Sequence, residues 1–213
     1  MYPTRIEVAH IMFTTTLLPA IRDAGPGARI VFVTSHEHTS VKQPVNWERL
    51  SSPEGEKEIP YSLSRYGASK IAGIYSTMHL QRALANEGIY VNCCHPGVRN
   101  RFLCLFYFTN TFLQVVVSDL TRSLSTILGK LSFILSIVES LMYQTVEVGA
   151  LTQLYLASSP EVESKGIKGQ FLWPVAKVFP EKASALAWDE GEQERYWDWA
   201  ESVADKAVKR VDN

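Results

Sequence analysis

Residues 29–35 read RIVFVTS, and this short stretch decides the fold class. Four β-branched or aromatic residues in a row are typical of a buried strand. Helical patterns lie on both sides of it, over residues 8–24 and 65–86, and each is followed by a glycine that ends a helix. A buried strand between two amphipathic helices predicts an α/β protein.

The rest of the chain repeats this alternation. We expect a second strand over residues 89–93 and a third over 169–173, with helices over 119–157 and from Glu190 onward. Residues 34–63 are polar and rich in proline, so we expect one long surface loop there. Strands separated by helices favour right-handed crossovers and a parallel sheet. We expect residues 1–213 to form a single domain.

Composition narrows the range of functions. The 213 residues carry 21 Lys and Arg against 22 Asp and Glu, for a net charge of -1, which argues against a nucleic-acid partner. Three cysteines, Cys93, Cys94 and Cys104, cannot build a disulfide framework, which favours a reducing compartment. The first ten residues lack the apolar core of a secretory signal. We therefore expect a cytoplasmic protein.

Two apolar stretches leave a membrane-associated alternative open. Residues 102–120 and 124–142 are rich in apolar side chains, but Asn110 interrupts the first, and Lys130 and Glu139 interrupt the second. A bilayer span needs about 20 apolar residues in a row. Association with the cytoplasmic face of a membrane is thus the alternative to a cytoplasmic location.

A candidate site for proton transfer is the stretch Tyr66-Gly67-Ala68-Ser69-Lys70. Residues four apart share one face of a helix, so Tyr66 and Lys70 should lie together. An ammonium near a phenol favours the phenolate, and such a phenol can exchange a proton with an alcohol or carbonyl. Taken alone, the spacing also fits a Tyr and a Lys on a helix surface. Its context favours a site, because Ser35 and Pro96-Gly97 follow the two neighbouring strands at the edge where open α/β sheets bind ligands.

The chain resembles the short-chain dehydrogenase/reductase family, in its retinol-dehydrogenase-like or WW-domain-oxidoreductase-like branch. The strings that carry the resemblance are LLPAI, RIVFVTS, RYGASK, VNCCHPG, SDLTRSL and KGQFLWP. The resemblance implies an incomplete Rossmann-like, doubly wound parallel sheet that retains the last three strands and their helices. It also implies an oxidoreductase that interconverts an alcohol and a carbonyl with NADP or NAD.

By this resemblance Tyr66 is the catalytic acid/base, Lys70 its partner, and Ser35 the donor to the substrate oxygen. Ser35 could instead be an ordinary loop residue. The partner is a small-molecule alcohol or carbonyl. The cofactor-binding residues that the resemblance implies are Tyr66, Lys70, Pro96, Gly97, Val98 and Ser118.

The chain also departs from the family pattern. No GxGxxG or equivalent glycine-rich turn occurs to hold a pyrophosphate, and the position of the family's catalytic Asn falls on Ile6. We therefore expect a carboxyl-terminal part of the family fold that binds cofactor poorly and is marginally stable. The alternative function is a catalytically inactive family member or a non-enzymatic interaction protein.

A second departure is the segment 98–114. Removing it joins HPG to VVVSDLTR, which fits the family pattern, and its ends can be encoded by sequences that resemble splice sites. Our hypothesis is that these residues are a translated intron. The alternative is a genuine insertion that faces lipid or covers the substrate.

Other candidate features have simpler interpretations. His36, His38 and His95 lack the fixed spacing of a metal site, so we expect no metal. Cys93 and Cys94 are expected to be buried packing residues. The tail tryptophans Trp188, Trp197 and Trp199 are expected to pack on the body of the protein rather than form a ligand cage.

Overall fold

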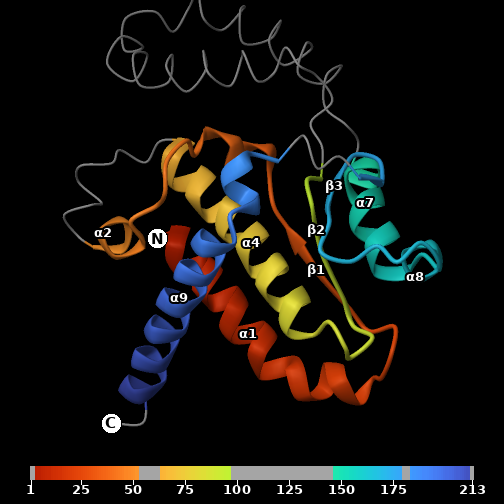
Figure 1. Ribbon diagram of the computed structural model, residues 1–213, viewed down its shortest axis with the longest axis horizontal. Helices are drawn as coiled ribbons and strands as arrows, with labels where there is room; N and C mark the ends of the chain where they lie inside the picture. The colour runs from red at the N-terminus through yellow and green to blue at the C-terminus, as the bar shows by residue number, and fades with distance from the viewer. Residues whose placement is uncertain (1–2, 53–62, 97–145, 179–182, 212–213) are drawn as a thin grey trace, which may run out of the picture. The chain divides into compact units, whose positions relative to one another are not determined.

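The computed structural model describes residues 3–52, 63–96, 146–178 and 183–211 (Figure 1). The chain divides into two compact units, residues 1–96 with 150–213, and residues 97–149. Of the second unit only residues 146–149 are described, as the start of a helix.

A four-stranded sheet forms the middle of the first unit, in the order β1-β2-β3-β4. The first three strands, β1 (Arg29–Val33), β2 (Tyr90–Cys94) and β3 (Phe171–Trp173), are parallel. They confirm the three predicted strands, although the third begins two residues later than expected. The short antiparallel strand β4 (Lys177–Val178) was not predicted, because two residues carry no hydrophobic pattern.

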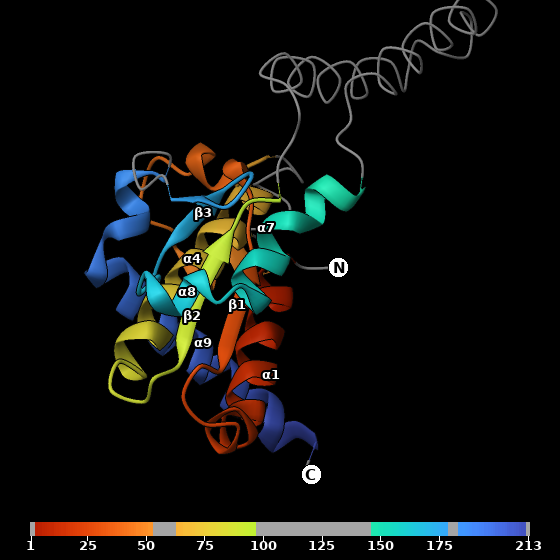
Figure 2. The same cartoon turned by 90° about the vertical axis from the view of Figure 1, so that its right-hand side faces the viewer.

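Two long helices, α1 (Pro3–Asp23) and α4 (Leu63–Ala83), cover one face of the sheet, and a third, α9 (Glu190–Val211), packs on these two helices (Figure 2). Ile30 and Phe32 of β1 belong to the core that these helices bury. The predicted inner face of α4 is confirmed, because Ile71, Tyr75 and Met78 are all buried. Full burial of each such side chain stabilises the fold by roughly 1.5–3 kcal/mol.

Two further helices, α7 (Val146–Ser158) and α8 (Glu161–Ser164), cover the opposite face. Leu156, Val162 and Leu172 pack there in a second core. With helices on both faces, the sheet is doubly wound, which confirms the predicted partial Rossmann-like architecture.

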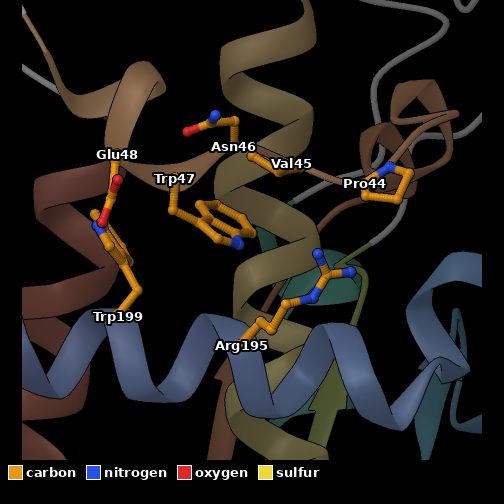
Figure 3. A pocket seen from close by; sticks show the side chains of 7 residues that line it. All are labelled: Pro44, Val45, Asn46, Trp47, Glu48, Arg195 and Trp199. Atoms are coloured by element: carbon orange, nitrogen blue, oxygen red, sulfur yellow. The ribbon is translucent and has the colours of Figure 1, made fainter.

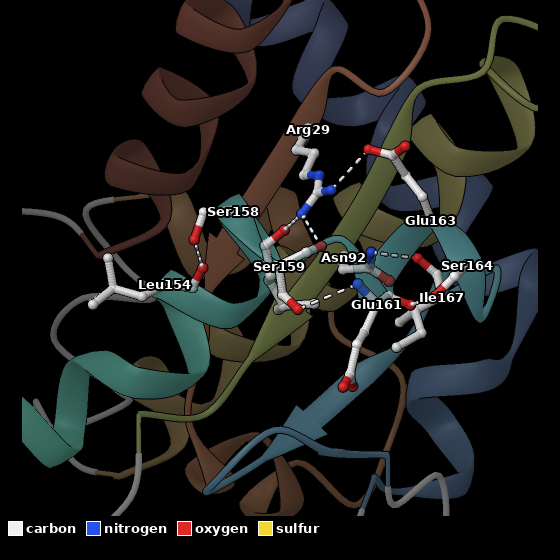
Figure 4. Close-up of polar contacts among 10 residues, drawn as sticks. Arg29, Asn92, Leu154, Ser158, Ser159, Glu161, Glu163, Ser164 and Ile167 are labelled. Carbon is white, nitrogen blue, oxygen red and sulfur yellow. Dashed lines mark hydrogen bonds and ion pairs between the residues drawn. The ribbon is translucent and has the colours of Figure 1, made fainter.

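The first residue of β1 fastens this second helical layer to the sheet (Figure 4). Nη1 of Arg29 donates to the carbonyl oxygens of Leu156 at 3.2 Å and Ser159 at 2.8 Å, at the carboxyl end of α7. Its Nη2 pairs with Glu163 at 2.8 Å. A cation at a helix carboxyl terminus satisfies carbonyls that have no partner within the helix. Asn92, in the middle of β2, makes a similar connection: its Nδ2 donates a hydrogen bond to the backbone carbonyl of Ile167 at 2.8 Å.

The prediction of one long loop over residues 34–63 is wrong for two segments. The 3₁₀ helix η1 (His36–Ser40) and the helix α2 (Trp47–Ser51) form within it. Trp47 is buried and stacks on Trp199 of α9, with ring centroids 5.7 Å apart. This partner lies about 150 residues further along the chain, so no local pattern could indicate it.

The tail packs on the body of the protein, as predicted. Trp197 is buried, and Trp188 and Trp199 are partly buried against the core. Trp47, Trp199 and Arg195 line a surface hollow of about 420 Å³. Figure 3 shows Trp199 and Arg195 extending from the same helix, α9, with Trp47 beside them. A further 3₁₀ helix, η3 (Ala185–Trp188), connects β4 to α9.

Several expectations fall on residues that the structure does not describe. The predicted helix over residues 119–157 is confirmed for its last part by α7. The proposed insertion 98–114 and both apolar stretches, 102–120 and 124–142, lie outside the described residues. Among the helices that are described, none has the length and apolar character to cross a membrane.

One prediction concerns the outer edge of β1, which has no described partner strand on the side away from β2. Val33 on this strand is 49% exposed. An apolar strand with unpaired backbone groups is a template for aggregation, and a lysine there blocks edge-to-edge pairing. We expect Val33→Lys to slow aggregation severalfold, measured by light scattering at 37 °C.

The matched control for this substitution is Val208→Lys on α9. Val208 is also 49% exposed, but it lies on a helix rather than at a sheet edge. If both lysines slow aggregation equally, added charge rather than edge protection is the cause, and the interpretation of β1 as the aggregating edge fails.

Candidate active site at the carboxyl edge of the sheet

Hydrogen bonds connect the carboxyl ends of the three parallel strands, so that these ends lie side by side. The backbone N–H of Thr34 donates to the carbonyl of Cys94 at 2.8 Å, and its hydroxyl donates to the same oxygen at 3.2 Å. The N–H of His95 donates to the carbonyl of Leu172 at 2.9 Å. Ser35 and Pro96, the next residues along β1 and β2, therefore leave the sheet at one common edge.

Ser35 is partly buried and caps the amino terminus of η1. Its Oγ accepts a hydrogen bond from the N–H of Glu37 at 3.2 Å. Its carbonyl accepts two, from the N–H of His38 at 3.3 Å and from Nδ1 of the same residue at 2.6 Å. Oγ accepts this bond through a lone pair, so the hydroxyl keeps its own hydrogen to donate to a ligand.

Gly67 brings the helix α4 into close contact with η1. A Cβ added at Gly67 would overlap the Oγ of Ser40 and lie 2.8 Å from the carbonyl oxygen of Glu37. Only glycine allows this approach, because any larger residue would push the helix away from a backbone atom. The contact places the start of α4, which carries Tyr66, beside the turn that carries Ser35.

Tyr66 and Lys70 lie together on α4, as their spacing predicts. Nζ of Lys70 is 5.4 Å from the centroid of the Tyr66 ring, and Tyr66 is 48% exposed. Between them, Ala68 and Ser69 are buried. The helix therefore faces inward with its small residues and presents the phenol and the ammonium on an accessible face.

Two histidines contact Trp173 at the same edge, and a third, His38, lies beside Phe171. The ring centroid of His36 lies 5.0 Å from that of Trp173, and the centroid of His95 lies 4.8 Å from it. Burial lowers the pKa of His38 to about 4 and that of His95 to about 4, so both rings are neutral near pH 7. Within the described part of the chain, no group of three His, Cys, Asp or Glu side chains could hold a metal ion.

Cys93 and Cys94 are both completely buried at the end of β2, which confirms the predicted packing role. Burial raises the pKa of both thiols, that of Cys94 to about 12. A thiol that stays protonated is a poor nucleophile, so these residues contribute packing and not chemistry.

The structure thus brings some of the predicted site residues to one edge and does not describe others. Ser35, Tyr66, Lys70 and Pro96 are described there, whereas Gly97, Val98 and Ser118 lie outside the described residues. The catalytic and cofactor-binding roles of all these residues stay predictions.

Sequence reasoning missed the parts that Gly67 and His38 play in building the edge. The sequence does contain a signal for Gly67, because a glycine inside a helical pattern usually has a packing reason. It contains none for His38, whose partners lie at Ser35 and Ser184.

Comparison with known proteins indicates the class. The chain is 30% identical to human polyprenol dehydrogenase over 196 residues, 89% of its own length, and 29% identical to human retinol dehydrogenase 14 over 92% of its length. It is 27% identical to the short-chain dehydrogenase/reductase iacJ of Pestalotiopsis fici over 94% of its length. The chain is thus similar, over about nine tenths of its length, to proteins named as short-chain dehydrogenase/reductases and dehydrogenases, which are oxidoreductases.

The chain spans about half the length of the curated relatives it matches. It covers 56% of the Pestalotiopsis protein, 49% of retinol dehydrogenase 14 and 50% of polyprenol dehydrogenase. A scan against models of protein families finds no match.

The contact at Gly67 generates a second prediction. Gly67→Ala places a methyl group against the Glu37 carbonyl and the Ser40 hydroxyl, which forces α4 and η1 apart. Overpacking of this kind costs about 1–3 kcal/mol. We expect the free energy of unfolding to fall by this amount in chemical denaturation. Gly191→Ala is the matched control on α9, where the nearest atom, Oδ1 of Asp189, would lie 3.3 Å away. Equal stability of both variants would contradict the close approach.

The buried histidines predict how stability depends on pH. In the unfolded chain a histidine takes up a proton near pH 6.5, whereas His38 and His95 in the folded chain stay neutral down to about pH 4. The unfolded state therefore binds more protons in this window, and stability falls as the pH is lowered from 6.5 to 4. Each histidine contributes roughly 3 kcal/mol to the loss at most.

Chemical denaturation between pH 6.5 and 5 checks this, because most carboxyl groups stay ionised there. The slope of the free energy of unfolding against pH should correspond to about two protons at its steepest, and His95→Gln should reduce it by about one. An unfolding free energy that does not change over this range would show that both rings take up protons in the folded chain as they do in the unfolded chain.

Proposed function

We propose that this chain carries the proton-transfer site of an NAD(P)-dependent oxidoreductase that interconverts an alcohol and a carbonyl. The observation that supports it most is the arrangement at the carboxyl edge. Lys70 lies 5.4 Å from the ring of a half-exposed Tyr66, on a helix that Gly67 fits closely against the Ser35 turn. Similarity to proteins named as short-chain dehydrogenase/reductases supports the same reaction class.

Each side chain has a role suited to its chemistry. Tyr66 would give its proton to a carbonyl oxygen, or take one from an alcohol, as the general acid or base. The Lys70 ammonium would stabilise negative charge as it develops on the phenol oxygen. Ser35 would donate a hydrogen bond to the reacting oxygen with its hydroxyl hydrogen, which the bond that Oγ accepts from Glu37 leaves available.

The residues present fit the nicotinamide end of an NADP or NAD cofactor. The Lys70 ammonium and the Tyr66 hydroxyl are donors that suit ribose hydroxyls. Pro96 is partly buried and follows β2 at the carboxyl edge of the sheet. The cofactor, when bound, would supply or accept the hydride. Within the sequence given, no glycine-rich turn is present to hold its pyrophosphate.

Retinol and polyprenol are the first substrates to test, because two relatives are named for them. The assay follows the absorbance of the reduced nicotinamide with each alcohol, and with retinal as the carbonyl. A small-molecule alcohol or carbonyl is the class of partner that we propose.

Tyr66→Phe tests the central role. The substitution keeps the ring and removes the hydroxyl, and loss of a general acid costs about 10²–10⁴ in rate. In a full-length version of the protein that includes the glycine-rich cofactor turn, we expect kcat to fall by this factor. The thermal midpoint should stay within about 2 °C of that parent because Tyr66 is half exposed.

The chain offers a matched control in Tyr90, which also has a lysine over its ring, with Nζ of Lys168 at 4.6 Å from the centroid. Tyr90 lies at the opposite end of β2 from Pro96, so Tyr90→Phe should leave turnover unchanged. Equal turnover by both variants would show that the role of Tyr66 is misassigned. A folded parent without turnover or cofactor binding would favour the non-enzymatic alternative.

A further inference from the structure

His38 is a completely buried polar side chain whose two ring nitrogens contact residues far apart in the chain. Its Nδ1 lies 2.6 Å from the carbonyl oxygen of Ser35. Its Nε2 lies 3.3 Å from the backbone nitrogen of Ser184, 146 positions along the sequence. The family chemistry described above makes no use of this residue.

The two contacts determine the state of the ring. A carbonyl oxygen only accepts, so Nδ1 carries the hydrogen, and a backbone N–H only donates, so Nε2 must accept. Both conditions are met by one form, the neutral ring protonated at Nδ1. Burial lowers the pKa of His38 to about 4, which keeps this form populated near pH 7.

Packing leaves the ring little freedom to turn. The Phe171 ring of β3 meets it edge to face, with centroids 5.1 Å apart. A ring held by two hydrogen bonds and an aromatic neighbour is a rigid spacer between the segments that it connects.

The Ser184 side of this spacer leads back to α4. Ser184 precedes η3, and the carbonyl of Leu186 in η3 accepts a hydrogen bond from the Tyr75 hydroxyl at 3.2 Å. Tyr75 lies on the same helix as Tyr66. The Ser35 turn is thereby connected to α4 twice, directly through Gly67 and indirectly through His38, Ser184 and η3.

We propose that His38 is a positioning residue that holds Ser35 in place for the proton transfer carried out by Tyr66. This inference rests on the proposed function. His38 fixes the backbone of Ser35 at its carbonyl, while the N–H of Glu37 fixes the lone pair of Oγ. With its carbonyl and its Oγ each held by a hydrogen bond, Ser35 has less freedom to lose when its hydroxyl donates to the reacting oxygen.

Two substitutions separate the two ring nitrogens. In His38→Asn the amide nitrogen can occupy the place of Nδ1 and keep the bond to Ser35. In His38→Gln the longer side chain brings its oxygen near the place of Nε2 and keeps only the bond to Ser184. We expect kcat for the carbonyl substrate to fall about 10- to 100-fold in His38→Gln and to stay within about 3-fold of the parent in His38→Asn. The KM for the cofactor should be unchanged in both.

A double-mutant cycle with Ser35→Ala distinguishes positioning from general stability. If His38 acts through the serine hydroxyl, His38→Gln should cause no further loss of kcat once that hydroxyl is gone. A residue that only stabilises the fold would lower kcat by the same factor in both backgrounds. Additive losses would therefore overturn the proposal, as would equal turnover by His38→Gln and the parent.

Amide hydrogen exchange gives a readout that does not depend on turnover. The Glu37 amide reports the Ser35 contact, so its exchange should speed up at least 10-fold in His38→Gln and little in His38→Asn. The Val91 amide, which donates to Gln81 at 2.8 Å, should not change in either variant. If the parent shows no turnover, the proposed function fails, and equal exchange at Glu37 in both variants overturns the inference separately.

Discussion

The close approach of Gly67 to the backbone of η1 is the constraint on which the site depends. A side chain of any size at this position would meet the Glu37 carbonyl, so the start of α4 can lie against the Ser35 turn only because a glycine is there. Tyr66 and Lys70 flank this contact along the helix. The geometry that supports an oxidoreductase is therefore set by the absence of one methyl group.

Three other sets of contacts in this unit help to hold α4 and η1 together. Helices on both faces hold the strands level, with Arg29 attaching α7 and the Thr34 N–H and hydroxyl attaching β1 to β2. Trp47 and Trp199 fold part of the segment after Ser35 onto α9. His38 connects the same turn to the C-terminal segment through a neutral ring. The edge is rigid because each of its turns is held at more than one point.

The sequence was sufficient to predict the parallel strands, the inner face of α4 and the edge at which the site residues gather. These features follow from hydrophobic periodicity and from strands that alternate with helices. It was insufficient for η1, α2 and η3, because Trp47 and His38 take their partners from residues near the C-terminus. It was also insufficient for β4, which has two residues and gains its order from pairing with Trp173 and Leu172. Tertiary contacts of this kind override local preference.

The contact between α4 and η1 can be measured directly in solution by nuclear Overhauser effects on the labelled chain. The account predicts a strong effect between the α protons of Gly67 and the β protons of Ser40, since a Cβ on Gly67 would overlap the Ser40 hydroxyl. It also predicts that this effect disappears in Gly67→Ala while the effects between α9 and Trp47 remain. A parent chain that is folded but lacks the Gly67–Ser40 effect would contradict the arrangement from which the site and its proposed chemistry are derived.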